Sequence, residues 1–412
     1  MNLKKFFKKF GPGIITGASD DDPSGIATYS QAGASFGFAT LWMALLTFPM
    51  MAAVQEMCAR IGIVTQKGIT SNIKEHYTKW VLYVLLFFSF PAIVMNIGAD
   101  ISAMGAVGNM LVPQIHETVF SIGFTVLLIV MLVVLPYSKI VKVLKFFCLS
   151  LLLYIVVPFI THQNWWQILK ETFVPEIKLN KEYIGILVAI LGTTISPYLF
   201  FWQANISVED YFANHQSQGK KEILTNMRED VFSGMFFSNL VMFFIILTTG
   251  AVLFKAGIHN IETVDQAAKA LEPLAGNAAY LLFALGIIGT GVLAIPVLSG
   301  SISYMFSEVF NFKEGLNKKF HEAKPFYGIM IISLLVGVSL QYVGLKPVTA
   351  QIYSAILYGL TAPVSLGIIL HLANNKKVMG DHKNGILSNT IGFITLIFNC
   401  LAALLMVYYE FF

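Results

Sequence analysis

Three consecutive aspartates interrupt an apolar stretch near the start of the chain. Asp20, Asp21 and Asp22 are followed at once by Pro23, Ser24 and Gly25. Proline removes a backbone hydrogen-bond donor and disfavours helix in the residue before it. The carbonyl groups freed by such a break, together with a carboxylate, are potential ligands for a cation. Asp22 stands directly before the proline, so we place it at the break, whereas Asp20 and Asp21 either approach the ion or line an aqueous vestibule.

A second apolar stretch carries a similar interruption. The run Gly192-Thr193-Thr194-Ile195-Ser196-Pro197-Tyr198 again combines glycine, hydroxyl residues and proline. Unwound backbone at membrane depth is tolerated only where protein or a water-filled cavity covers it. A simple proline kink explains either break alone. Two breaks at matching positions, one of them with three carboxylates, favour a binding site.

Three further acidic residues lie in or beside apolar stretches. An ionisable group inside a membrane is costly and indicates a functional site by default. Asp100 lies in the middle of such a stretch. It is either part of an ion path or a structural hydrogen-bond acceptor for another helix. Glu56 stands one helical turn before Arg60, which predicts an ion pair rather than a metal ligand. Glu308 ends a stretch, and we expect it to be solvated.

The composition indicates that membrane helices must position these residues. Of the 412 residues, 56% are hydrophobic and 12% are charged, against about 25% charged in soluble domains, and the mean hydropathy is +0.71. A soluble enzyme, a fibrous protein and a disordered chain are therefore excluded. The net charge of +4 is too small to indicate nucleic acid, and the three scattered cysteines exclude a disulfide framework or a cysteine zinc site.

Eleven apolar segments are long enough to cross a bilayer, which takes about 20 residues each. They are residues 11–36, 38–62, 80–111, 117–136, 140–161, 183–212, 230–254, 277–306, 326–343, 348–371 and 386–409. With the N-terminus in the cytoplasm, 21 of the 27 basic residues fall on the cytoplasmic side, as the positive-inside rule expects. We therefore predict an all-α, multi-pass protein of the plasma (inner) membrane, with its C-terminus outside and a single domain over residues 1–412.

The two breaks occupy the first position in two consecutive sets of five spans. Residues 11–161 form the first set and residues 183–371 the second, which leaves 386–409 as an additional helix. Interrupted helices at corresponding positions of two halves are the best sequence pointer to a transporter site at the bilayer midplane. The chain shows no nucleotide-binding loop and no nucleophile–base arrangement, so we expect no enzyme activity, no cofactor and no obligate protein partner.

Several of these motifs resemble those of the Nramp family of divalent-metal transporters. The similarity covers Gly11-Pro12-Gly13, Asp22-Pro23, Ala27-Thr28, Gln31-Ala32-Gly33-Ala34, Gln55, Ala59-Arg60-Ile61-Gly62-Ile63-Val64-Thr65, Gly68, Gly192, Thr194 and Pro197. The resemblance implies a LeuT-like inverted repeat of five plus five helices with unwound helices 1 and 6. It also implies alternating access around a central metal ion.

The departures from the family pattern concern the metal ligands themselves. The family uses an aspartate and an asparagine in span 1, and here Asp22 is kept while Ser24 and Gly25 end the motif. In span 6 the family uses a carbonyl and a methionine thioether, and these positions are Thr193 and Ser196. Thioether ligands suit transition metals, whereas carboxylate, carbonyl, hydroxyl and water suit Mg²⁺, Ca²⁺ and Mn²⁺. Smaller side chains also leave space for a partly hydrated ion, which Mg²⁺ prefers. The pattern resembles the Nramp-related magnesium transporters.

The groups that carry protons in the family are also replaced. Asp100 is kept in span 3, but the family's glutamate three residues later is Ala103. Two histidines of span 6 are Tyr198 and Gln203 here. Histidine changes charge near neutral pH, whereas tyrosine and glutamine do not. The sequence therefore predicts uptake that is not strictly proton-coupled, with Asp100 as a residual path.

The leading hypothesis is a Mg²⁺ importer, with Mn²⁺ as a second substrate. Asp22 is the anionic ligand, and the Thr193 carbonyl, Ser196, Ser24 and the space at Gly25 complete the site. Asp20, Asp21, Asp100, Tyr198, Gln203 and Gln351 are candidates for the ion pathway. One alternative is a proton-coupled Mn²⁺/Fe²⁺ importer. The other is an amino-acid or organic-solute transporter of the same fold, against which the aspartate cluster argues, because such sites hold a carboxylate at a helix N-terminus.

Overall fold

The fold was examined in a computed structural model that describes residues 11–135, 152–215, 219–344 and 346–411. Regular secondary structure in these ranges is entirely helical. Nine stretches among the described residues are long and apolar enough to cross a membrane. Eight are α4 (Trp42–Thr65), α6 (Lys79–Leu111), α7 (Glu117–Val134), α13 (Lys220–Thr249), α16 (Ala279–Phe310), α17 (Lys324–Ser339), α18 (Pro347–Asn374) and α20 (Ile386–Phe411), and the ninth joins α11 (Lys181–Thr194) to α12 (Pro197–Asp210).

The first predicted span is present as two helices separated by a short break. These are α2 (Pro12–Asp20) and α3 (Pro23–Phe36). Most of the fifth predicted span, 140–161, lies outside the described residues, and α9 (Leu153–Ile160) covers its end. The shorter connecting helices are α5 (Ile69–His76), α10 (Trp165–Phe173), α14 (Val264–Ala268), α15 (Glu272–Ala275) and α19 (Lys376–Met379).

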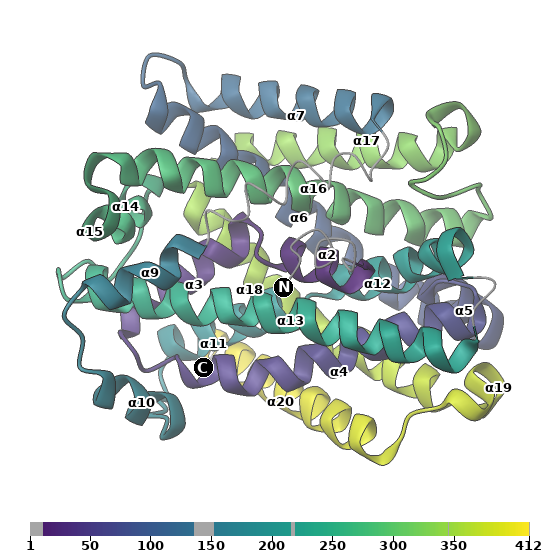
Figure 1. Cartoon of the computed structure of the whole chain (residues 1–412). Coiled ribbons are helices and arrows are strands. Elements are labelled where there is room, and N and C mark those ends of the chain that lie inside the picture. The colour runs from purple at the N-terminus through teal and green to yellow at the C-terminus, as the bar shows by residue number, and fades with distance from the viewer. Residues whose placement is uncertain (1–10, 136–151, 216–218, 345, 412) are drawn as a thin grey trace.

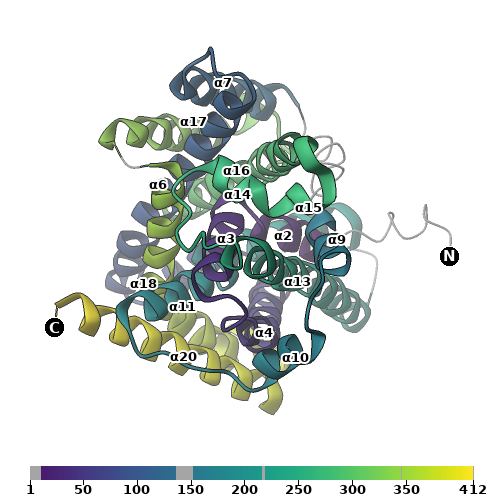
Figure 2. The ribbon, with the colours of Figure 1, turned by 90° about the vertical axis from the view of Figure 1, so that its left-hand side faces the viewer.

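The broken helices lie at the centre of the bundle. Figures 1 and 2 show α2 and α3 surrounded by longer helices, with α6 and α16 on one side and α13 and α4 on the other. Helices α7 and α17 form one edge of the molecule, and α20 forms the opposite edge (Figure 2). Many apolar side chains on these outer helices are exposed, including Val126, Ile332 and Leu404. Lipid-facing surfaces have this character, whereas the centre that holds the breaks is shielded.

Each broken helix packs against the span that follows the other broken helix. Helix α2 lies against α13, and α12 lies against α4. Both contacts depend on a glycine: a Cβ atom on Gly17 would lie 2.3 Å from the Gly234 carbonyl oxygen, and one on Gly62 would lie 2.3 Å from that of Ala204. Small residues allow helix backbones to approach in this way within membranes. The repeat limits themselves, 11–161 and 183–371, stay a prediction.

Candidate metal centre

The first break is an N-cap built around Asp22. Helix α2 ends at Asp20, Asp21 adopts a non-helical conformation (φ −84°, ψ 52°), and Asp22 is extended (φ −70°, ψ 171°). Pro23 then starts α3, where its missing N–H is not needed. The Gly25 N–H donates to Asp22 Oδ1 at 2.7 Å. The carboxylate therefore caps a helix whose N-terminus carries partial positive charge.

The second break lacks such a side-chain cap. Helix α11 ends at Thr194, and Ser196 precedes Pro197 at the start of α12 without capping it. The Ser196 hydroxyl instead turns back, donating to the carbonyls of Gly192 (2.8 Å) and Thr193 (2.6 Å). The predicted Thr193 carbonyl ligand thus already accepts one hydrogen bond and keeps one lone pair for an ion.

Two residues that the sequence interpretation missed complete the surroundings of Asp22. Asn96 on α6 donates from Nδ2 to Asp22 Oδ2 at 2.9 Å. Ser354 on α18 donates to Asn96 Oδ1 at 2.9 Å, and its hydroxyl lies 3.3 Å from that of Ser24. Asn96 stands one helical turn before Asp100 on the same face of α6, and that spacing is the signal that could have found it. Three helices, α3, α6 and α18, therefore meet at Asp22.

The site also contains buried polar atoms without partners. Asp100 is fully buried and lies close enough to Asp22 for electrostatic repulsion; neither carboxylate oxygen accepts a hydrogen bond of 3.5 Å or shorter in the described chain, although the Ser24 N–H of α3 lies nearby. Both interpretations of Asp100, as part of an ion path and as an acceptor for another helix, therefore stay predictions. Gln351 accepts a hydrogen bond from Ser24 at its carbonyl (3.2 Å), while its side-chain Nε2 is buried and unpartnered. Unpaired buried polar groups are rare and require an explanation.

Asp20 and Asp21 lie beside this site, under α13. Their side chains are 1% and 3% exposed. Ser238 of α13 donates to Asp20 Oδ2 at 2.7 Å and lies 3.5 Å from Asp21 Oδ1. Within the described residues, no three His, Cys, Asp or Glu side chains converge closely enough to hold one metal ion. An ion here would therefore complete its coordination with neutral oxygens and water.

A large cavity lies on the α2 side of the breaks. It has a volume of about 630 Å³ and is lined by residues of α2, α12 and α13, among them Gln203, Ser207 and Asp230. Between it and the aspartates, Thr16 donates to the Gln203 side-chain carbonyl, and the Tyr198 hydroxyl donates to the Ser19 carbonyl at 3.1 Å. Gln203 and Tyr198, both predicted for the ion pathway, thus link α12 to α2 by hydrogen bonds between the cavity and the aspartates. Asp20 and Asp21 are not among the residues that line the cavity.

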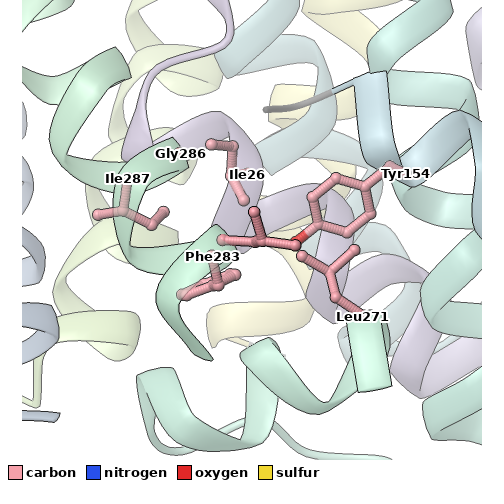
Figure 3. Close-up of a pocket in the computed structure, with 7 residues that line it drawn as sticks. Ile26, Tyr154, Leu271, Phe283, Gly286 and Ile287 are labelled. Carbon is pink, nitrogen blue, oxygen red and sulfur yellow. The ribbon is translucent and has the colours of Figure 1, made fainter. Parts of the chain in front are cut away.

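A second pocket lies beyond the break, against α3. Figure 3 shows Ile26, Leu271, Phe283 and Ile287 facing one another, with Tyr154 beside them. This pocket is apolar and has no room for a water molecule. The Tyr154 hydroxyl is its one polar side-chain group, and it contains no carboxylate, so the polar cavity on the α2 side is the larger of these two openings.

The expectation that Glu308 is solvated is wrong, whereas the Glu56–Arg60 ion pair is confirmed. Glu308 is 5% exposed, because α5 folds back beneath the end of α16 and the Ser71 N–H donates to Glu308 Oε2 at 3.1 Å. In the following loop, burial and then the charges of Glu308 and Glu209 raise the pKa of Glu314 to about 9. Arg60 Nε lies 3.0 Å from Glu56 Oε1.

Comparisons with known proteins agree with this architecture. A family model described as natural resistance-associated macrophage protein-like (Nramp) matches residues 13–409. The divalent metal cation transporter MntH of Klebsiella pneumoniae subsp. pneumoniae is 26% identical over 386 residues, covering 91% of this chain and 87% of its own. MntH of Caldanaerobacter subterraneus subsp. tengcongensis is 24% identical over 397 residues, covering 95% and 90%. The crystal structure of the Eremococcus coleocola manganese transporter with an aromatic bis-isothiourea substituted compound has a TM-score of 0.78 at 18% identity, covering 98% of this chain and 87% of that one.

A multi-pass helical bundle with two interrupted helices around buried carboxylates is, by class, a membrane transporter. The chain belongs to the Nramp family, whose model matches almost its whole length. The predicted fold class, with unwound helices 1 and 6, is confirmed by the breaks and by the likeness to the Eremococcus fold.

Proposed function

We propose that this Nramp-family transporter carries Mg²⁺, with Mn²⁺ as a second substrate, through a site centred on Asp22. The observation that carries the proposal is the chemistry around that carboxylate. Its hydrogen-bond neighbours are the Gly25 amide, Asn96 and, through Asn96, Ser354, and none of them offers sulfur or imidazole. Hard oxygen ligands suit Mg²⁺ and Mn²⁺ better than softer metals.

The small side chains at Gly25 and Ser196 favour a partly hydrated ion over a fully dehydrated one. A Cβ atom on Gly25 would lie 3.2 Å from the Asp20 carbonyl oxygen, so the family's asparagine at this position would crowd the break. Ser196 keeps its hydroxyl against its own helix. Mg²⁺ dehydrates reluctantly and usually retains several waters, which need the room that a larger side chain would fill.

The proposed transport is driven by gradient and voltage without strict proton coupling. Ala103 cannot carry a proton, and Tyr198 and Gln203 are neutral groups engaged in holding α12 to α2. With the N-terminus inside, the cavity between α2, α12 and α13 faces the cytoplasm and serves as the exit. A potential of about 100 mV supplies roughly 4.6 kcal/mol to a divalent cation, twice the value for one charge.

The test is uptake by purified protein in liposomes, with Mg²⁺ and Mn²⁺ measured separately and a pH-sensitive dye inside. Mg²⁺ entry without acidification, lost in Asp22→Ala, supports the proposal. Mn²⁺ entry with acidification and no Mg²⁺ entry points to the alternative, a proton-coupled Mn²⁺/Fe²⁺ importer. The names of the relatives and the unpartnered Asp100 carboxylate are the observations that favour that alternative. An organic solute with a carboxylate is disfavoured by the buried aspartates.

A further inference from the structure

Asp20 and Asp21 are buried acids that the Asp22 site does not use. Ser238 reaches both, yet Asp20 Oδ1 is buried without any partner in the described chain. No described Lys, Arg or His forms an ion pair with any of the three consecutive aspartates. A buried charge is strongly unfavourable unless it is paired or coordinates a metal.

The negative charge of the ionised carboxylates exceeds what one divalent cation neutralises. Four aspartates at the breaks are at least 97% buried: Asp20, Asp21, Asp22 and Asp100. The other three lie within electrostatic range of Asp22. Four carboxylates carry four negative charges when ionised, and one divalent ion at Asp22 neutralises two. A second divalent ion neutralises the rest.

A neutral group beside the two acids points independently to a ligand. Tyr29 of α3 is fully buried within electrostatic range of Asp20 and Asp21, with Thr193 nearby, and its hydroxyl makes no hydrogen bond of 3.5 Å or shorter within the described chain. Helix α2 also ends at Asp20, so the partial negative charge of its C-terminus faces the same place. A hydroxyl oxygen, carboxylates and a helix C-terminus together favour a cation.

We propose that Asp20 and Asp21, with the hydroxyls of Ser238 and Tyr29, form a second site for a hard divalent cation beside the Asp22 site. This inference rests on the proposed function, because it assumes that the first ion binds at Asp22. The second site lies on the α2 side of the break, and α2 leads to the cavity. Repulsion between the two ions assists release of one of them, as it does between adjacent sites in channels.

The experiment counts bound ions on the full-length protein in detergent. Mn²⁺ alone is the probe, since its electron paramagnetic resonance signal in solution separates free from bound metal, and Mg²⁺ is then added as competitor. Wild type is expected to bind two Mn²⁺, Asp22→Ala one, the double variant Asp20→Asn/Asp21→Asn one, and the triple variant none. Asp265→Asn, an exposed acid on α14, is the control and keeps two.

The outcomes separate the two proposals. A double variant that keeps the wild-type count, or a wild type that binds one ion, overturns the second site and indicates that protons neutralise Asp20 and Asp21. An Asp22→Ala variant that keeps the wild-type count overturns the Asp22 site instead. Ser238→Ala guards against misfolding of the double variant: it is expected to weaken one of the two sites about fivefold, the effect of one lost hydrogen bond, and to leave the other unchanged. Equal affinities in Ser238→Ala and wild type at both sites count against the proposal.

Discussion

The two broken helices share a backbone design but differ in chemistry. Each consists of a helix, a non-helical pair and a proline that starts the next helix. At the first break Asp22 caps α3 and meets α6 and α18 through Asn96 and Ser354. At the second, the Ser196 hydroxyl bonds only to carbonyl groups of the preceding helix, α11. In the proposed site, the first break therefore supplies the negative charge that balances the ion, and the second supplies carbonyl oxygens and close packing.

The largest expected effect comes from removing the charge at the first break. Asp22→Ala should lower metal uptake about 10- to 100-fold or more, because a buried cation loses its anionic ligand and one charge-assisted contact contributes about 1.5–3 kcal/mol or more. Proteoliposome uptake measures it, with thermal unfolding as a check on folding. Asp381→Asn, an exposed acid, is the matched control. Near-normal uptake in Asp22→Ala would falsify the assignment of the site.

The next largest effect concerns packing. Adding a methyl group to a glycine should reduce stability more at the second break than at the first. A Cβ atom on Gly192 would lie 1.9 Å from the Ala355 carbonyl oxygen, a backbone atom of α18 that cannot move aside. Gly192→Ala should therefore reduce stability by about 1–3 kcal/mol.

Gly25→Ala is the counterpart at the first break. Its nearest obstacle lies at 3.2 Å, so a shift of a few tenths of an ångström accommodates the methyl group. Thermal unfolding in detergent measures both variants. A larger loss of stability for Gly25→Ala than for Gly192→Ala would reverse the comparison.

Asn96→Leu tests the contact between α6 and Asp22. The change keeps the number and branching of the side-chain heavy atoms but removes the donor to Asp22 Oδ2 and the acceptor of Ser354. A hydrogen bond to a charged group is worth about 1.5–3 kcal/mol, so the KM for Mg²⁺ should rise about tenfold or more. Asn399→Leu is the control, since Asn399 is equally buried but donates only to Thr395 of its own helix. Similar KM values for both variants contradict a role for Asn96 at the site.

Substitutions of Ser24 and Ser196 compare the two breaks through smaller effects on uptake. Ser24 links α3 to α18 through the Gln351 carbonyl, whereas the Ser196 hydroxyl donates to carbonyl groups of α11. Ser24→Ala should lower the initial rate of uptake about fivefold, and Ser196→Ala about twofold or less, since a neutral hydrogen bond contributes about 1 kcal/mol. The reverse order would indicate that Ser196 leaves its own helix to coordinate the ion.

The smallest effect is expected at the Met104 thioether, which lies close to the first break. A Cβ atom on Gly291 would lie 2.6 Å from Met104 Sδ and 3.4 Å from Pro23 Cγ, which places this sulfur near the α3 proline. If oxygen ligands alone bind the ion, Met104→Leu should leave the ratio of Mn²⁺ to Mg²⁺ uptake unchanged within about twofold. Leucine and methionine exchange with little effect on packing. A loss of Mn²⁺ uptake alone would make Met104 a soft ligand.

Much of the fold could be predicted because its signals are local. Apolar runs of membrane length and proline–glycine breaks depend on neighbouring residues, so the spans within the described chain and the interruption before Pro23 agree with the structure. The site was predicted less completely. Asn96, Ser354 and Ser238 stand on helices distant in sequence from Asp22, and no spacing rule connects them.

Glu308 is a residue whose burial the sequence did not predict, because it depends on a helix distant in sequence. Its position at a helix end predicts solvation, but α5 covers it. Which loop covers which helix end depends on contacts between residues 237 positions apart, Ser71 and Glu308.

The sequence by itself determined that this chain spans a membrane, where its helices break and which break carries charge. These properties follow from hydrophobicity and backbone chemistry, which act over a few residues. Only the tertiary structure decided which polar groups meet the charge: the Asn96 amide, the Ser354 and Ser238 hydroxyls and the carboxylate of Asp100. The physical reason is that burial in a low-dielectric interior makes each unpaired polar atom costly, so the packing of distant helices determines which polar atoms are paired and which are left without a partner.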